Sequence, residues 1–193
     1  AQAAIDFITA SEANADGGWP WNISATAHTR PTYWQIEAYR LGARAKLAVP
    51  NEVAGRAKLF LQRRVRPTYV SCDVAADNAA APTVDHCSAF GILALIHLGE
   101  RPDGPLLRGP IMAMAKTGPN LSQACPAAHL GTIVMRHVGG EPWAVWSKNL
   151  TAELLSKEGK GAAAGSWPLI NNLHDGTCLS IMMLQTMSEP QDE

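Results

Sequence analysis

Residues 141–168 read EPWAVWSKNLTAELLSKEGKGAAAGSWP. The first part of this stretch predicts an amphipathic helix, because its apolar residues recur at helical spacing. They form one stripe made of Trp143, Trp146, Leu150 and Leu154. Pro142 stands where the first helical residue is expected, a position at which its missing N–H costs nothing. A loop rich in Gly and Ala follows and leads to Gly165-Ser166-Trp167.

The same order of features opens the chain. An apolar helical segment around Ile5 and Phe7 is followed by a polar stretch and then by Gly17-Gly18-Trp19. Trp19 and Trp167 lie 148 positions apart, which is about three times a period of 49, and periods of roughly 20–50 residues are typical of arrays of supersecondary units. We therefore expect a protein of repeated helical hairpins.

Two kinds of helical segment alternate along the chain. Amphipathic segments are expected near 1–13, 51–64, 106–116 and 142–158, and segments that are apolar nearly all round near 31–46, 85–98, 126–138 and 175–187. A helix without a polar face is a buried helix, so the apolar segments should form an inner layer. Within 31–46 one face is shared by Trp34, Ala38, Leu41 and Ala45. Few β-branched residues and no hairpin-turn signals argue against strands.

Composition places the chain among ordinary globular proteins. Its 193 residues suit a single domain over 1–193, with 47% hydrophobic and 17% charged residues. The net charge of −1 gives no reason to expect nucleic acid or an anionic membrane as a partner. The longest apolar run, 90–96, is too short to span a bilayer, so we expect a soluble protein. Because the chain begins inside a predicted helix, it is also interpreted as a fragment of a longer toroid.

The two Trp-containing stretches carry a family resemblance. Phe7 with Gly17-Gly18-Trp19, and Leu154 with Gly165-Ser166-Trp167, resemble degenerate copies of the repeat of the prenyltransferase and squalene-oxidase repeat family. In that repeat a Gln stands four residues after the aromatic or Leu; here Ser11 and Glu158 take its place. The stretch TYWQIEAYRLGA also resembles uncharacterised bacterial members. The resemblance implies an all-α fold, an α/α toroid of which about four hairpins are present.

The resemblance does not carry cyclase activity with it. Squalene–hopene-type cyclases resemble this fold but protonate their substrate with a D-x-D-D motif, and nothing here matches it; the stretch 72–77, CDVAAD, is only superficially acidic. Cyclisation also needs aromatic faces that stabilise carbocations. The expected inner helices offer only Tyr33, Trp34, Tyr39 and Phe90. Cyclase activity is therefore disfavoured.

A metal site is implied by a second part of the resemblance. Protein prenyltransferase β-subunits hold catalytic zinc with an Asp-x-Cys pair that opens an inner helix and a later His, and Asp85, Cys87 and His129 are placed similarly. Three protein ligands with one open position are typical of catalytic zinc. The alternative is that Asp85 caps a helix and Cys87 is a small buried hydrophobe. The cofactor prediction is accordingly zinc or none.

The starts of the inner helices should meet at one rim if the hairpins form a ring. This places the candidate ligand-binding residues together: Tyr33, Trp34, Asp85, Cys87, His129 and Asp175. Helix N-termini favour thiolates and bound anions. Zinc binding, or a disulfide between Cys125 and Cys178, would each be chemically reasonable there. Without CxxC spacing the cysteines leave the redox compartment open, with a secreted or periplasmic location among the alternatives.

Three functions remain open, and with them whether the protein is an enzyme. The first is a toroid domain that binds an apolar small molecule or a protein partner without cyclase activity. The second is a zinc-dependent isoprenoid-processing transferase, and the third is a polymer-acting hydrolase or lyase by fold analogy. The missing acid motif and the degenerate repeats favour the first. Self-association through the terminal hairpin, or a missing partner domain at that end, is also expected, because its last helix has no obvious protection over Ile181, Met182, Met183 and Leu184.

Overall fold

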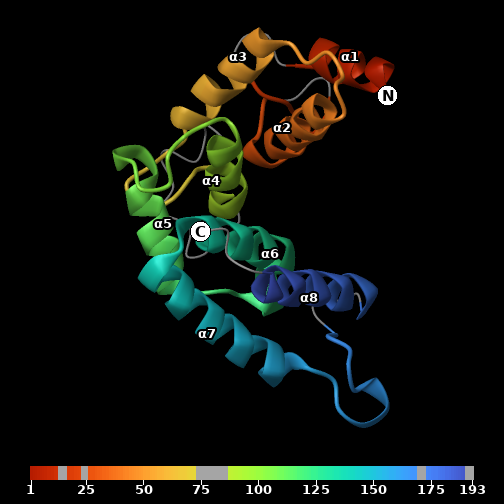
Figure 1. The fold of residues 1–193 in the computed structure, drawn as a ribbon, viewed down its shortest axis with the longest axis vertical. Coiled ribbons are helices and arrows are strands. Elements are labelled where there is room, and N and C mark those ends of the chain that lie inside the picture. The colour runs from red at the N-terminus through yellow and green to blue at the C-terminus, as the bar shows by residue number, and fades with distance from the viewer. Residues whose placement is uncertain (13–16, 23–25, 73–86, 169–172, 190–193) are drawn as a thin grey trace. The chain divides into compact units, whose positions relative to one another are not determined.

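The computed structural model describes residues 1–12, 17–22, 26–72, 87–168 and 173–189, apart from the side chains of 122–125 and 173–174. Within these ranges the protein is all-α, with eight α-helices and no strand beyond one isolated bridge between Val65 and Val70 (Figure 1). The helices are α1 Gln2–Ala10, α2 Thr29–Arg44, α3 Asn51–Gln62, α4 Ser88–His97, α5 Pro105–Thr117, α6 Leu121–Val138, α7 Gly140–Lys157 and α8 Leu173–Ser188. The expected helical fold class is confirmed.

The chain forms two compact units, Ala1–Pro110 and Ile111–Glu193. In the first unit α2 packs against α1, α3 and α4. In the second unit α6 packs against both α7 and α8, which Figure 1 shows in teal and blue. The four segments expected to be most apolar are all helices, and they pair with each other inside each unit, α2 with α4 and α6 with α8. No helix of the described residues combines the length and hydropathy needed to cross a membrane.

The paired apolar helices run in the same direction. In the second unit, the Arg136 side chain near the end of α6 donates hydrogen bonds to the carbonyls of Thr186 and Glu189, at the end of α8. In the first unit, His28 and Cys87 stand at the N-cap positions of α2 and α4, and their side chains lie close to each other. Each pair therefore begins at a common end, as the prediction of a shared rim requires within a unit.

The two Trp stretches have the same local structure. The indole N–H of Trp19 donates to the carbonyl of Ile8 at 2.8 Å, and that of Trp167 donates to the carbonyl of Leu154 at 2.8 Å. Both Trp backbone N–H groups donate to a Thr hydroxyl at 3.0 Å, that of Thr32 or that of Thr177. These bonds tie each Trp to the helix before it and the helix after it, which is the arrangement expected of two copies of one unit.

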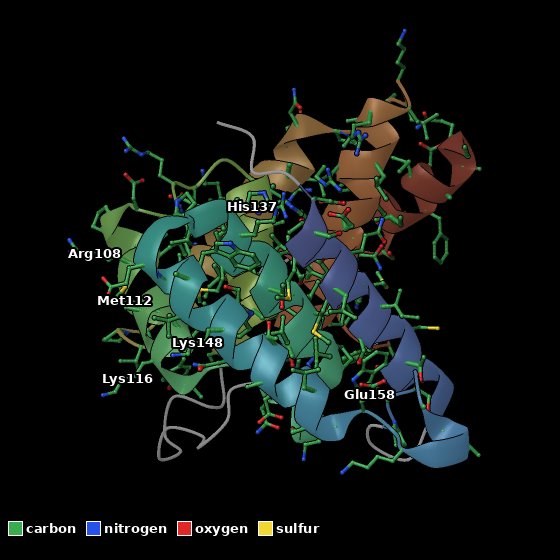
Figure 2. All side chains as sticks on the ribbon, turned by 60° about the horizontal axis from the view of Figure 1, so that its bottom comes forward. Arg108, Met112, Lys116, His137, Lys148 and Glu158 are labelled. Atoms are coloured by element: carbon green, nitrogen blue, oxygen red, sulfur yellow. A yellow bond between two sulfur atoms is a disulfide. The ribbon has the colours of Figure 1, made fainter. Side chains whose placement is uncertain are left out.

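A glycine with left-handed backbone lies in the turn before each tryptophan, and in the second turn a glutamate bonds to it. Gly17 and Gly165 both adopt left-handed backbone, with φ of 73° and 78°, a conformation that side chains other than Gly rarely accept. Glu158 follows α7 (Figure 2). Its carboxylate accepts a hydrogen bond from the backbone N–H of Gly165 at 3.1 Å. The Glu158 carboxylate thus provides a side-chain acceptor for this turn.

The predicted apolar faces of α7 and α2 differ in whether the structure buries them. In α7 the predicted stripe is confirmed for three of its four residues, because Trp146, Leu150 and Leu154 are buried, whereas Trp143 is half-buried. In α2 the face that contains Trp34 and Leu41 is exposed, and the expectation of a buried face there is wrong. The buried side of α2 consists of Tyr33, Ile36, Tyr39 and Gly42 together with the first-turn residues Thr29, Pro31 and Thr32.

One face of α5 carries a row of exposed side chains. Arg108, Met112 and Lys116 follow each other at intervals of four along the outside of this helix (Figure 2). Met112 is an exposed apolar side chain between two cations. The buried side of α5 contains Leu107, Ile111 and Ala115, so the helix is amphipathic as its sequence predicts.

Candidate functional site at the first turns of α2 and α4

The candidate site, here called the α2/α4 rim, consists of the first two turns of α2 and α4 together with residues 70–72. Its frame comes from the two N-cap positions. His28 has extended backbone, and its Nδ1 accepts a hydrogen bond from the backbone N–H of Arg30 at 3.2 Å, which caps α2. Cys87 occupies the corresponding position of α4 without a side-chain cap bond. Because α2 and α4 pack together along their length, their first turns lie side by side.

Residues 70–72 are fixed to both helices by hydrogen bonds. The backbone N–H of Val70 donates to the Ser88 hydroxyl at 3.0 Å. Thr29 forms two bonds with this segment: its N–H donates to the carbonyl of Cys72 at 3.0 Å, and its hydroxyl donates to the carbonyl of Ser71 at 2.6 Å. The side chains of these residues are buried, apart from that of Cys72: Thr29, Val70, Ser71 and Ser88. The segment is thus held by both helix starts at once.

A disulfide joins this segment to α4. Cys72 and Cys87 are bonded, with their Cα atoms 5.2 Å apart. Cys87 is fully buried, whereas Cys72 is half-buried. His28 lies beside the pair, since one ring nitrogen and the two sulfur atoms are all within 4.8 Å of one another. Disulfides persist mainly in oxidising compartments, and this bond is consistent with such a location.

Aromatic rings surround the same end of the two helices. Tyr33, Trp34 and Phe90 form a cluster of edge contacts with ring centroids 4.9 to 6.3 Å apart. The guanidinium of Arg30 lies over the ring of Phe90, 5.4 Å from its centroid. Trp21 contacts the imidazole of His28 at 5.6 Å. The rim therefore combines a sulfur–imidazole group with an aromatic surface.

The aromatic rings at this rim differ in their exposure to solvent. Tyr33 and Phe90 are buried, whereas Trp34 is 51% exposed and Trp21 is 62% exposed. Burial, and secondarily the charge of Glu37, raises the pKa of Tyr33, so its phenol stays protonated at physiological pH. The rim consequently offers water two indole rings and no phenolate.

The structure brings together three of the predicted ligand-binding residues. Tyr33, Trp34 and Cys87 all belong to the α2/α4 rim. Asp85 lies outside the described residues, and Asp175 is exposed in the first turn of α8, in the second unit. These two remain predictions.

His129 occupies a different environment, inside α6 of the second unit. Its side chain is buried, and its Nδ1 forms no hydrogen bond with any described atom. Desolvation by burial lowers the pKa of His129, so its imidazole is neutral at physiological pH. A neutral imidazole is the form that ligates metals, but Cys87 carries a disulfide in place of a thiolate. Zinc binding by Asp85, Cys87 and His129 stays a prediction, and it requires this bond to open.

The alternative of a disulfide between Cys125 and Cys178 is wrong. Cys178 is a free thiol on the exposed side of α8, so it does not take part in a disulfide. The side chain of Cys125 lies outside the described part of the chain. The sequence analysis missed Cys72 and His28 as members of the site. The signal available for both was their position in the sequence. His28 directly precedes α2, and Cys72 precedes the segment that leads into α4.

Comparison of the chain with protein-family models, curated proteins and solved structures found no match.

Proposed function

We propose that this protein is a binding domain built of helical-hairpin repeats, and that the α2/α4 rim takes an apolar small molecule or an apolar segment of a partner. The observation that carries the proposal is two exposed indole rings at this rim, that of Trp34 beside the buried rings of Tyr33 and Phe90, and that of Trp21 beside the imidazole of His28. Exposed tryptophans grouped on one surface are common in binding sites, because an indole offers a large apolar face and one polar N–H.

The energetics favour an apolar occupant. Covering one large apolar side chain contributes roughly 1.5–3 kcal/mol, and both rings are about half or more uncovered. The guanidinium of Arg30 at this rim lies over the ring of Phe90. An apolar ligand would therefore gain contact area at the rim without having to displace a hydrated charge from the indole faces.

The finer fold prediction belongs to this proposal. In an α/α toroid all inner helices run parallel and begin at one rim. The parallel pairs α2/α4 and α6/α8, and the two equivalent Trp turns, support this arrangement. Enzymatic activity is not part of the proposal.

We expect Trp34→Ala to weaken binding of an apolar fluorescent probe, such as an anilinonaphthalene sulfonate, by about 10-fold, which corresponds to roughly 1.4 kcal/mol. Trp21→Ala should have a smaller effect in the same direction. Probe fluorescence in titrations of the full chain measures both. Phe7→Ala is the matched control, since Phe7 is an exposed aromatic on α1 of the same unit. Equal probe affinity in all three variants and the parent would refute the rim as the binding site.

A second surface supports self-association. In α8, Met183 is buried, but Ile181, Met182 and Leu184 are exposed, so the predicted lack of protection is confirmed for three of the four residues. From Gly176 to Ser188 this helix carries no charged residue. Two copies of such a face do not repel each other, so the occupant we propose is the α8 of a second chain.

Sedimentation velocity over a range of concentrations tests this association. We expect the parent to form dimers as concentration rises, and Ile181→Glu with Met182→Glu to remain monomeric because facing carboxylates repel. Oxidation of the dimer should also cross-link the exposed Cys178 of two copies. Leu155→Glu, at an exposed apolar position of α7, is the control that should leave dimers intact. A parent that is monomeric at every concentration would contradict the proposal.

A further inference from the structure

The geometry points to a second state of the α2/α4 rim, in which the Cys72–Cys87 disulfide is reduced and His28, Cys72 and Cys87 bind one zinc ion. The disulfide and the metal would be alternative occupants of the same three side chains. The starting observation is that the two sulfur atoms and an imidazole nitrogen lie within 4.8 Å of one another, although they come from three separate segments of the chain.

The backbone supports such a site without the disulfide. Three hydrogen bonds fix residues 70–72 to Thr29 of α2 and Ser88 of α4, and none of them involves sulfur. Val70 is fully buried, and a Cβ built on Gly91 of α4 would lie only 2.5 Å from its side chain. The close approach therefore depends on Gly at position 91. Opening the S–S bond leaves both cysteines attached to fixed backbone, so their sulfur atoms remain neighbours.

The donor set matches zinc. Two thiolates and one imidazole are ligands that Zn²⁺ prefers, and three protein ligands leave one position for water or another ligand. Cys87 stands at the N-terminus of α4, where the helix dipole stabilises a thiolate. Burial of Cys87 would otherwise disfavour that charge, and a bound Zn²⁺ compensates it.

Zinc binding by His28 would compete with the hydrogen bond by which this residue caps α2. In the present state Nδ1 of His28 accepts the N–H of Arg30. If Nδ1 ligates zinc, its lone pair is no longer available to that N–H. If Nε2 ligates, Nδ1 must carry the proton and cannot accept. In both cases zinc removes the cap bond of α2, so zinc binding should change the hydrogen bonding at the start of this helix.

The chemical steps balance with a dithiol as reductant. One thiolate of the dithiol attacks Sγ of Cys72, the more exposed sulfur, and Cys87 leaves as a thiolate. The second thiolate of the dithiol then displaces Cys72, so the dithiol ends as a cyclic disulfide and the protein gains two electrons. Zinc binding to the two sulfurs releases the protons that thiols carry.

Co²⁺ is the spectroscopic probe for this site, and the full chain is the sample. The protein is reduced with dithiothreitol, desalted without oxygen and titrated with Co²⁺, which Zn²⁺ then displaces. We expect one metal per chain, with tetrahedral ligand-field bands and thiolate-to-cobalt charge transfer. The oxidised protein should show neither. Bound Zn²⁺ should also slow the return of the disulfide in air.

Variants assign the ligands. Cys72→Ser with Cys87→Ser should abolish the charge-transfer band, while Cys125→Ser with Cys178→Ser should leave it unchanged. His28→Asn removes the imidazole but retains a good N-cap residue, and it should weaken zinc by at least about 10-fold, the lower limit for losing even an outer-shell partner. A helical circular dichroism spectrum of the reduced apoprotein is required.

Three outcomes would overturn the inference. One is a reduced protein that binds no cobalt, and another is a cobalt spectrum that survives in the Cys72→Ser/Cys87→Ser variant. The third is loss of helical structure on reduction alone, because the backbone would then not hold the site. Probe binding by Trp34 tests the proposed function separately, so failure of either experiment leaves the other result standing.

Discussion

Replacing Trp19 with alanine lowers the free energy of unfolding of the first unit by about 3–5 kcal/mol, the range for deleting a large buried aromatic side chain. Trp19 is only 2% exposed. Its ring contacts that of Tyr39 edge-on at 5.7 Å, and its indole N–H bonds to the carbonyl of Ile8. The deletion therefore leaves a cavity and removes one hydrogen bond to the Ile8 carbonyl, which keeps its bonds from Ser11. Urea unfolding followed by circular dichroism measures the change, and hydrogen exchange assigns it to the unit.

Two other tryptophans serve as comparisons for this experiment. Trp167 has the same indole hydrogen bond but is half-buried, so Trp167→Ala should cost the second unit less than Trp19→Ala costs the first. Trp21 is mostly exposed, and Trp21→Ala should change stability by no more than about 0.5 kcal/mol. If Trp19→Ala unfolds at the same urea concentration as the parent, Trp19 does not lock α1 to α2, and our account of the repeated turn is wrong.

The repeated turn was predictable from sequence because its signals are local. Left-handed backbone calls for glycine at Gly17 and Gly165, two residues before each tryptophan, and each indole N–H bonds back to a carbonyl of the preceding helix, 11 or 13 residues earlier. The existence of the four apolar helices was equally predictable, because these segments have few β-branched residues and no hairpin-turn signals. These features depend on residues close together in the chain, which is where sequence patterns carry most information.

The burial of individual faces was harder to predict. Segment 31–46 has apolar residues on more than one side, so periodicity alone does not select the buried one. Packing against α4 buries Tyr33 and Ile36 and leaves Trp34 and Leu41 exposed. Which face of α2 is buried therefore depends on how α4 packs against it. That is also why the exposed ring of Trp34, which the proposed function uses, could not be recognised as exposed beforehand.

The candidate site was predicted only in part. Cys87, Tyr33 and Trp34 were found because helix starts can be located from sequence. Cys72 pairs with Cys87 across a separation of 15 residues, and His28 joins them from a third segment. Such pairing depends on how α2 and α4 dock. Four cysteines allow three pairings, which spacing alone does not distinguish.

Opening the disulfide should cost the first unit about 3 kcal/mol, the chain-entropy estimate for a loop of roughly 15 residues. The closed loop restricts the unfolded chain, so its loss acts mainly by giving the unfolded state more freedom. Urea unfolding of the parent, with and without dithiothreitol, and of Cys72→Ala/Cys87→Ala measures this cost. Cys178→Ala, at the exposed free thiol, is the control that should unfold like the parent. Equal stability of the oxidised and reduced forms would contradict the prediction.

The reduced unit should nevertheless stay folded, because domains commonly have about 5–15 kcal/mol of stability and the loss is smaller than that. The bonds from Thr29 and Ser88 to residues 70–72, and the burial of Val70, do not depend on sulfur. Zinc should then recover most of what reduction removes. A ligand that binds only the folded state, at about 100 times its Kd, adds roughly 2.7 kcal/mol, which nearly offsets the lost disulfide. The unfolding midpoint of the reduced protein should therefore rise with zinc concentration, and in the Cys72→Ala/Cys87→Ala variant it should not change.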